Sequence, residues 1–333
     1  MEYTIVSGTN LNVSRIALGT WAIGGWMWGG SDEAESIRTI HAALDKGINL
    51  IDTAPVYGFG VSEETVGKAI EQRGRREDVF IATKVGLEWR DGSITRNSSR
   101  DRIRQEIQDS LRRLRTDYID IYQVHWPDPA VPIEETARTL RALNKEGLIR
   151  AIGVSNYSPE QMERFLSASE LHTVQPPYNL FERQIESDVL PYARRKNLSA
   201  LVYGPLCRGL LSGRMRPDTK FTGDDLRKSD PKFQTPRFAQ YLSAVEQLDD
   251  LAQKRYGKRV MDLAVRWVLD QPGVSVALWG ARRPEQLEAV NNALDWKLDG
   301  DALASIDRIL RETIADPVGP EFMAPPARST AAA

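Results

Sequence analysis

The chain contains very little cysteine and histidine. Among its 333 residues there are one cysteine, Cys207, and three histidines, His41, His125 and His172. A single cysteine excludes an intrachain disulfide and a thiolate metal cluster, in agreement with a reducing compartment. The histidines show no HExxH or similar spacing, so the sequence predicts no metal site.

The chain also lacks an excess of charge of one sign and any long apolar run. Its 44 basic and 46 acidic residues are mixed along the sequence and give a formal charge of −2. Such a balance produces no field that would attract nucleic acid or an acidic membrane surface. The start has no basic segment followed by an apolar one, and no stretch of about 18 apolar residues occurs. We therefore expect a cytoplasmic protein that binds neither nucleic acid nor membrane.

Short β-rich runs alternate with amphipathic runs from residue 15 to residue 310, which is typical of βα units around a parallel sheet. Eight strands are predicted, over residues 15–19, 48–52, 79–84, 119–125, 149–153, 173–175, 198–203 and 274–278. Eight such units match the length of a (β/α)8 TIM barrel, in which active sites lie at the C-terminal ends of the strands. A doubly wound open sheet is the alternative, but the GxGxxG turn that should follow its first strand is absent.

Two segments depart from the repeat. Residues 212–238 are polar and broken by prolines, and their place directly after the seventh strand favours an active-site lid over a loosely ordered surface loop. Residues 316–333 are rich in proline and alanine without periodicity, so we expect a partly disordered tail. No domain linker is apparent, and residues 1–315 are predicted to form one domain.

Polar side chains end three neighbouring predicted strands. Asp52 ends the second strand, Lys84 the third and His125 the fourth. Because adjacent strands lie about 4.8 Å apart, the three side chains can converge. The stretch NLIDTAPVYG continues past Asp52 through Pro55, and this turn should bring Tyr57 back over the same strand ends. The sequence therefore predicts a site made of Asp52, Tyr57, Lys84 and His125.

This set of groups favours proton delivery to a carbonyl oxygen. A free phenol has a pKa near 10, and we expect the ammonium of Lys84 to lower the pKa of Tyr57 and make it a better general acid. Asp52 neutralises Lys84, and His125 can donate a hydrogen bond to the same oxygen. None of these groups is a strong nucleophile at neutral pH. Reduction of a carbonyl is therefore favoured, with the hydride coming from a cofactor.

The sequence resembles the aldo-keto reductase family, in particular its bacterial NADPH-dependent branch. The resemblance covers nearly the whole chain and rests on the motifs INLIDTAPVYGFGVSEETVGKAI, IATKVG, DYIDIYQVHWPD, IRAIGVSNYS, VQPPYNL and YGPLCRGLLSG. It implies a TIM barrel with an N-terminal β-hairpin cap and extended loops at the C-terminal face. It also implies that the family's catalytic tetrad is carried by Asp52, Tyr57, Lys84 and His125.

The remaining strand ends offer groups for a nicotinamide cofactor, NADPH or NADP+. Ser155, Asn156 and Gln175 carry hydroxyl and amide groups suited to a carboxamide, since Ser158 is the better cap of the next helix. After the eighth strand, GARRPEQLEAV opens a helix with two arginines near its start, which form either a solvated charge pair or a contact with an adenosine 2′-phosphate. One such contact would give roughly a tenfold to 100-fold preference for NADPH. The resemblance assigns it to Arg282. By resemblance, the cofactor-binding residues are Gly19, Thr20, Trp21, Asp52, Ser155, Asn156, Gln175, Tyr203, Gly204, Pro205, Leu206, Cys207, Arg208, Gly209, Leu210, Gly213, Arg214, Gly280, Arg282 and Gln286.

Aromatic residues are concentrated in the first four βα loops. They are Trp21, Trp26, Trp28, Tyr57, Phe59, Trp89 and Trp126. The predicted substrate pocket consists of Trp21, Trp26, Trp28, Tyr57, Trp89, His125 and Trp126. Such a pocket favours flat or apolar carbonyl compounds, or sugars stacked on indole rings.

Two other functions are compatible with this pattern. One is a regulatory subunit that binds the cofactor tightly and reports redox state to a partner, as in the potassium-channel β-subunit relatives. The other is a barrel aldolase in which Lys84 forms a Schiff base, although Asp52 beside it would keep the amine protonated. The sequence leaves open the natural substrate, the physiological direction and any homo-oligomer.

Overall fold

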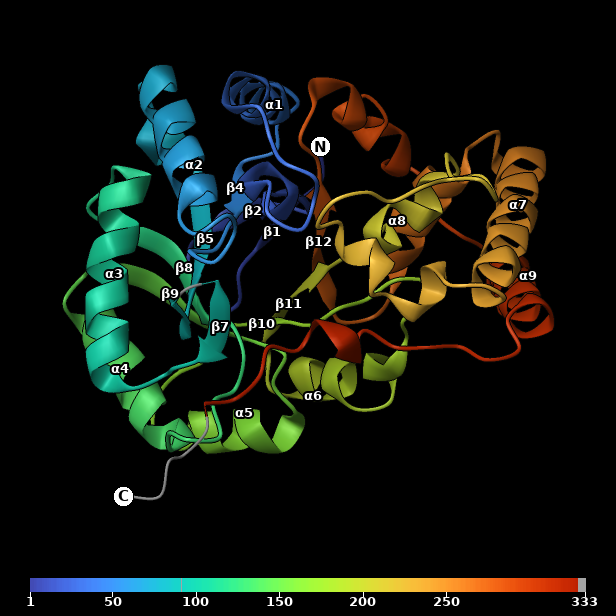
Figure 1. The fold of residues 1–333 in the computed structure, drawn as a ribbon. Helices are drawn as coiled ribbons and strands as arrows, with labels where there is room; N and C mark the ends of the chain where they lie inside the picture. Colours follow the sequence, from blue (N-terminus) through green and yellow to red (C-terminus); the bar gives the residue numbers. More distant parts are fainter. Residues whose placement is uncertain (91, 329–333) are drawn as a thin grey trace.

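The computed structural model describes residues 1–90 and 92–328. Eight parallel strands close into a barrel surrounded by helices, as Figure 1 shows, which confirms the predicted TIM barrel. Each predicted strand overlaps one strand of the barrel. In chain order these are β3 (Ile16–Gly19), β4 (Leu50–Asp52), β5 (Phe80–Val85), β8 (Ile119–Val124), β9 (Ile149–Ser155), β10 (Thr173–Gln175), β11 (Ser199–Tyr203) and β12 (Val274–Gly280).

The helices around the barrel bury one apolar face and end at residues that favour a turn. In α3, Ile103, Ile107 and Leu114 are buried, as their spacing predicts. Gly47 and Gly147 follow two of the helices with φ of 83° and 78°, a backbone region open to glycine. The helices are α1 (Glu33–Asp45), α2 (Val61–Arg73), α3 (Arg100–Leu114), α4 (Ile133–Lys145), α5 (Pro159–Leu166), α6 (Val189–Arg195), α7 (Arg237–Tyr256), α8 (Val260–Asp270) and α9 (Gly300–Thr313).

Two antiparallel hairpins lie outside the barrel sheet. Strands β1 (Tyr3–Ile5) and β2 (Asn12–Ser14) form the first, whose buried residues Val6, Leu11 and Val13 pack into the apolar cluster inside the barrel and cap its N-terminal end. Strands β6 (Leu87–Arg90) and β7 (Ser93–Arg96) follow β5 and form the second hairpin at the opposite end. Both ends of the barrel are therefore shaped by an added hairpin.

The segment after α9 runs across the face of the molecule that carries the β6–β7 hairpin (Figure 1). Its carbonyl groups at Pro325 and Pro326 accept hydrogen bonds from the side chain and backbone of Arg96, at 2.9 and 3.3 Å. Arg328 pairs with buried Asp128 at 3.1 Å. The disorder expected at the end of this tail concerns residues 329–333, which lie outside the described residues. Within the described part of the chain, every helix is too short or too polar to span a lipid bilayer.

Candidate active site

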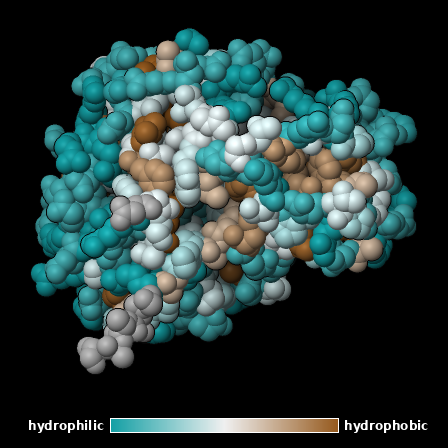
Figure 2. Space-filling model, viewed as in Figure 1, coloured by the Kyte–Doolittle hydropathy of each residue, from teal (hydrophilic) through white to brown (hydrophobic). Residues whose placement is uncertain are grey.

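A cavity of about 910 Å3 opens at the C-terminal ends of the barrel strands. Its walls come from the loops after β3, β4 and β11, from the β6–β7 hairpin, and from the tail at Phe322–Pro326. In Figure 2, apolar residues gather around a hollow in the middle of this face, inside a hydrophilic rim. The volume lies near the upper end of the range for ligand sites, which is about 300–1,000 Å3.

The predicted residues Asp52, Tyr57 and Lys84 meet at the floor of this cavity. The ammonium of Lys84 donates to Asp52 Oδ1 at 2.6 Å, to the carbonyl oxygen of Thr53 at 2.9 Å and to the Tyr57 hydroxyl at 3.2 Å. Lys84 is only 1% exposed, so its charge has protein groups in place of water. One buried cation therefore bridges a carboxylate and a phenol.

Close packing between two backbone turns fixes the position of Tyr57. The turn after β4 lies so near the turn after β3 that a Cβ on Gly58 would stand 2.0 Å from the carbonyl oxygen of Gly24. A Cβ on Gly24 would stand 2.5 Å from the carbonyl carbon of Tyr57. Both positions therefore require glycine, and Tyr57 is held between them and the strand ends.

His125 completes the predicted group. Its backbone N–H donates to Val85 at the end of β5, at 2.9 Å. Its ring stands edge-on to the ring of Tyr57, with centroids 5.9 Å apart and an interplanar angle of 82°. Desolvation, together with the positive charge of Lys84, holds the pKa of His125 well below its usual value. The imidazole is therefore neutral at neutral pH and can donate one hydrogen bond.

The pKa of Tyr57 differs from the sequence-based expectation. Burial raises this pKa above 10.0, while Lys84 lowers it and Asp52 raises it. The expectation of a lowered pKa is wrong, because loss of hydration outweighs the attraction of one ammonium. For Lys84, burial lowers the pKa, but Asp52 and Tyr57 raise it, and the outcome is a raised pKa. At neutral pH the pair is thus a protonated phenol beside an ammonium.

The predicted nicotinamide residues form a connected set of hydrogen bonds. Gln175 donates to the second oxygen of Asp52 at 2.7 Å, and Ser155 donates to the carbonyl oxygen of Gln175 at 2.8 Å. Asn156 donates to Ser155 at 3.0 Å and accepts from the hydroxyl of Tyr203 at 2.9 Å. These side chains line the cavity in fixed orientations and offer hydroxyl and amide groups of the kind that a carboxamide pairs with.

Ser158 takes the capping role that the sequence assigned to it. Its hydroxyl accepts from the backbone N–H of Gln161, whose side chain accepts from the N–H of Ser158. This reciprocal capping box satisfies the start of α5. Ser155 and Asn156 are therefore not needed by the helix.

Most of the predicted cofactor residues border the cavity, and three do not. Those that line it are Gly19, Thr20, Trp21, Asp52, Ser155, Asn156, Gln175, Tyr203, Gly204, Pro205, Leu206, Arg208, Gly209, Arg214, Gly280, Arg282 and Gln286. Cys207 and Leu210 are fully buried in the core beneath it. Gly213 ends the 3₁₀ helix Cys207–Ser212, where a Cβ would stand 2.9 Å from Val260.

Arg208 lines the cavity, but its guanidinium belongs to a buried ion network. It pairs with Glu182 and with Asp230, and Lys232 pairs with Glu182 at 2.8 Å and donates to the carbonyl oxygen of Gly319 at 3.0 Å. Two cations thus balance two carboxylates in the protein interior. This network joins the glycine-rich segment after β11 to residues 226–233 and to the tail.

Three other cations line the cavity without a carboxylate partner among the described residues. They are Arg214, Lys220 and Arg282. Arg282 donates to the carbonyl oxygens of Trp28 and Gly30, at 2.6 and 3.2 Å. A cavity end with such cations is suited to phosphate groups. Arg214 and Arg282 are among the residues predicted from the sequence, whereas Lys220 is not, although it lies in residues 212–238, for which a lid was predicted.

The aromatic residues divide into an inner and an outer group. Trp21, Trp26, Trp28, Tyr57, His125 and Trp126 line the cavity as predicted, whereas Trp89 lies outside its lining. Apolar wall residues from three further segments were not predicted from the sequence, and they are Leu87, Ile94, Met215, Phe221, Leu226, Phe322 and Met323. These residues lie in a short added hairpin, in residues 212–238 and in the tail, outside the βα repeat, so no periodic signal placed them at the cavity.

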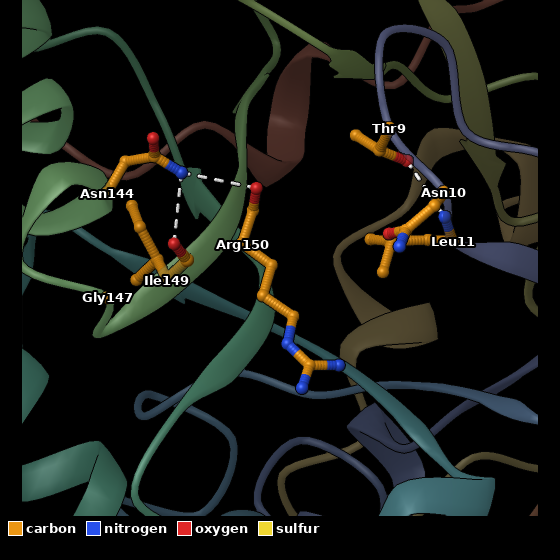
Figure 3. Close-up of a pocket in the computed structure, with 7 residues that line it drawn as sticks. All are labelled: Thr9, Asn10, Leu11, Asn144, Gly147, Ile149 and Arg150. Atoms are coloured by element: carbon orange, nitrogen blue, oxygen red, sulfur yellow. Dashed lines mark hydrogen bonds between the residues drawn. The ribbon is translucent and has the colours of Figure 1, made fainter.

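A second cavity, of about 510 Å3, lies where the N-terminal hairpin turn meets the turn before β9. Figure 3 shows the side-chain amide of Asn144 bridging the carbonyl oxygens of Ile149 and Arg150, at 3.0 and 3.2 Å. Arg150 itself pairs with buried Asp120 at 3.0 Å. The polar groups here stabilise a turn at the end of the barrel away from Lys84.

Comparisons with known proteins agree with this geometry. The model of the Aldo/keto reductase family matches residues 15–311. The chain is 61% identical over 328 residues to aldo-keto reductase YhdN of Bacillus subtilis, covering 98% of this chain and 99% of that protein. It is 38% identical over 321 residues to the NADH-specific methylglyoxal reductase of Escherichia coli, covering 92% and 97%.

Solved structures give the same result. The glycerol dehydrogenase AKR11B4 from Gluconobacter oxydans superposes with a TM-score of 0.88 at 54% identity, covering 97% of this chain and 99% of that chain. The holo form of the aldo-keto reductase AKR11C1 from Bacillus halodurans superposes with a TM-score of 0.79 at 29% identity, covering 96% and 98%.

Proposed function

Because the chain belongs to the aldo/keto reductase family and is thus an oxidoreductase that acts on carbonyl compounds, we propose that it reduces aldehydes and ketones to alcohols with NADPH. The observation that carries this proposal is the contact of Lys84 with both Asp52 and Tyr57 at the floor of the cavity. A buried phenol beside an ammonium is a proton donor placed where a carbonyl oxygen can enter.

The residues of this chain divide the chemistry among them. A reduced nicotinamide, when bound, supplies the hydride. Tyr57 donates its proton to the carbonyl oxygen, and Lys84 stabilises the phenolate that remains. Asp52 keeps Lys84 charged and in place, and His125, as a neutral imidazole, donates a hydrogen bond that orients the carbonyl oxygen. Tyr57 then recovers its proton from solvent.

The cavity walls support the cofactor assignment. Ser155, Asn156 and Gln175 would hold the carboxamide, and Tyr203 would pack against the nicotinamide ring. The glycine-rich segment after β11 would approach the pyrophosphate with its backbone amides. Arg282, whose guanidinium donates to the carbonyl oxygens of Trp28 and Gly30, would bind the adenosine 2′-phosphate, and this favours NADPH. The relative from Escherichia coli is named as NADH-specific, so the preference requires direct measurement.

The aromatic walls and the names of the relatives favour small carbonyl compounds. One relative is a methylglyoxal reductase and one structural neighbour is a glycerol dehydrogenase. Indole rings such as Trp21 and Trp28 accept flat or apolar groups and the faces of sugars. Short aldehydes, hydroxyketones and aromatic aldehydes are therefore the substrates we propose.

The two other functions considered from the sequence are less well supported. A regulatory subunit with little turnover is not favoured, because the similar proteins are named as reductases or dehydrogenases. An aldolase would need Lys84 as a free amine. The contact with Asp52 raises the pKa of Lys84 and keeps it an ammonium.

The proposal is tested with the purified protein and both coenzymes. Methylglyoxal, glyceraldehyde, dihydroxyacetone and benzaldehyde are offered in turn, and the absorbance of the reduced nicotinamide is followed. We expect NADPH to be consumed in the presence of at least one of these compounds, and more slowly when no carbonyl compound is added. If the protein binds coenzyme but consumes neither NADPH nor NADH with any of them, the proposed reductase activity is wrong.

A further inference from the structure

Three aromatic side chains continue outward from the rim of the catalytic cavity. The ring centroids of Trp26 and Phe59 lie 5.0 Å apart with the rings tilted by 47°, and those of Phe59 and Trp89 lie 5.8 Å apart with a tilt of 52°. These are the separations of interacting aromatic pairs. Trp26 lines the cavity, whereas Phe59 and Trp89 lie beyond its lining. We call this row, Trp26, Phe59 and Trp89, the aromatic shelf.

Phe59 is held in a backbone conformation that a phenylalanine rarely adopts. Its φ is 55°, and it lies between Gly58 at 65° and Gly60 at 105°. The left-handed region is unfavourable for a bulky side chain, and residues found there concentrate at functional sites. Phe59 is also 37% exposed, so its ring is not held there by the core. Strain and exposure together indicate that the ring serves a contact made outside the folded chain.

Trp89 is held in position by contacts with the β6–β7 hairpin and with α3. It lies on β6 and pairs across the hairpin with Ile94, which lines the cavity. The guanidinium of Arg102 stands 5.8 Å from the indole centroid and is itself held by Glu106 at 3.0 Å. The outer end of the aromatic shelf is therefore anchored by the β6–β7 hairpin and by α3.

The inner end of the aromatic shelf is continuous with the site described above. Trp26 packs against the apolar cluster that contains Val56 and Leu87, and Tyr57 and Trp126 pack against the same cluster. Trp26 lines the cavity and its ring lies 5.0 Å from that of Phe59, so it connects the cavity wall to the outer end of the aromatic shelf. An aromatic ring suits such a surface because tilted and offset ring pairs attract one another.

We infer that the aromatic shelf is an outer subsite for the distal aryl ring of an aromatic carbonyl substrate. The inference rests on the proposed reductase function and extends it by naming a substrate class. Its determining residue is Phe59, with Trp89 as the second contact. Aldehydes that carry two linked rings would gain contacts with this subsite that a single-ring aldehyde cannot reach.

The test compares a long and a short substrate in Phe59→Gly. Glycine adopts the left-handed region without the steric cost that phenylalanine has there, so this change removes the ring and keeps the backbone conformation accessible. For biphenyl-4-carboxaldehyde we expect kcat/KM to fall about 5- to 10-fold through KM, whereas for benzaldehyde it should stay within about twofold. Trp89→Ala should show the same selective loss. Tyr3→Ala, which removes an exposed aromatic ring at the N-terminal hairpin, should change neither value.

Equal losses for both aldehydes in Phe59→Gly, or no loss for the long one, would overturn the inference. If the wild-type protein reduces neither aldehyde with NADPH or NADH, the failure belongs to the proposed function. The aromatic shelf is then judged by binding alone, using tryptophan fluorescence and biphenyl-4-carboxylate as the probe. Phe59→Gly should weaken this binding about 5- to 10-fold, and unchanged binding would contradict the subsite.

Discussion

The ammonium of Lys84 lies 3.2 Å from the hydroxyl of Tyr57, and the same ammonium lies 2.6 Å from a carboxylate oxygen of Asp52. Two opposing effects therefore act on the pKa of the Tyr57 phenol. Burial raises the pKa of Tyr57, and Lys84 partly offsets that rise. The phenol therefore keeps its proton until a substrate oxygen takes it, and Lys84 lowers the free energy of the phenolate then formed.

Lys84→Met should lower kcat for aldehyde reduction by about 10²- to 10⁴-fold, because phenolate would form without a neighbouring positive charge. The variant leaves Asp52 as a buried unpaired carboxylate, which costs about 3–5 kcal/mol of stability. Asp52→Asn/Lys84→Met removes that charge, so its melting temperature should recover while its kcat stays low. Recovery of kcat in the double variant would show that Lys84 acts only through stability.

The rate of carbonyl reduction should be nearly independent of pH from about 6 to 9. Tyr57 stays protonated in this range because its pKa lies above 10.0, and His125 stays neutral because its pKa lies well below 6.5. The rate should fall only as Tyr57 loses its proton in strongly alkaline solution. A profile of kcat against pH checks this. If kcat instead fell on acidification with a midpoint near pH 6.5, His125 would titrate in the active enzyme and would not be held neutral.

Arg282→Ala should reduce the preference for NADPH over NADH. One charge-assisted contact with the 2′-phosphate is worth about 1.5–3 kcal/mol, so kcat/KM for NADPH should fall about 10- to 100-fold while that for NADH changes little. Arg283→Ala removes the exposed neighbouring cation and serves as the control. Equal losses with both coenzymes would assign Arg282 to holding Trp28 and Gly30 in place.

Glu106→Gln should stabilise the fold at alkaline pH and not at acidic pH. Burial raises the pKa of Glu106 to about 7, with Glu63 adding to the rise, while Arg102 and the N–H of Gly86 oppose it. Because the folded pKa exceeds the unfolded one, the stability that Glu106 provides is complete below pH 4.5 and is lost as pH rises through 7. The loss at pH 8.5 is about 3 kcal/mol for an isolated group.

Melting temperatures of Glu106→Gln and wild type should thus agree near pH 5 and diverge by pH 8.5, with the variant higher. Glu33→Gln, which alters the surface pair with Lys68, should shift the melting temperature little at either pH. The difference in melting temperature between Glu106→Gln and wild type is compared at the two pH values. If the variant loses ground to wild type between pH 5 and pH 8.5, a raised pKa of Glu106 is contradicted.

The barrel strands, the three residues near their ends and the turn that carries Tyr57 could be predicted because all follow from local pattern. Each strand is a short, mostly apolar run, and parallel strands bring the residues at their C-terminal ends to one face of the barrel. Gly58 carried a further signal, since the turn that places Tyr57 admits no side chain there. Motif and periodicity were therefore sufficient to predict that these four residues lie together, and their catalytic role stays a prediction.

The walls of the cavity could not be predicted in the same way. Phe322 and Met323 reach the cavity because the tail is tied to Arg96, a contact across more than two hundred residues that no periodicity encodes. The ion network of Arg208 depends likewise on Glu182 and Asp230 meeting in three dimensions. The pKa of Tyr57 was predicted with the wrong sign, because the sequence shows its charged neighbours but not how completely water is removed.

The most direct test of the account is Tyr57→Phe, measured with the best substrate of the carbonyl panel. The dissociation constant of NADPH should stay within about twofold of wild type, because the phenol hydroxyl is assigned to the proton step and not to the coenzyme, whereas kcat should fall about 10²- to 10⁴-fold. A variant with wild-type kcat would contradict the assignment of Tyr57 as the proton donor, and with it the central claim.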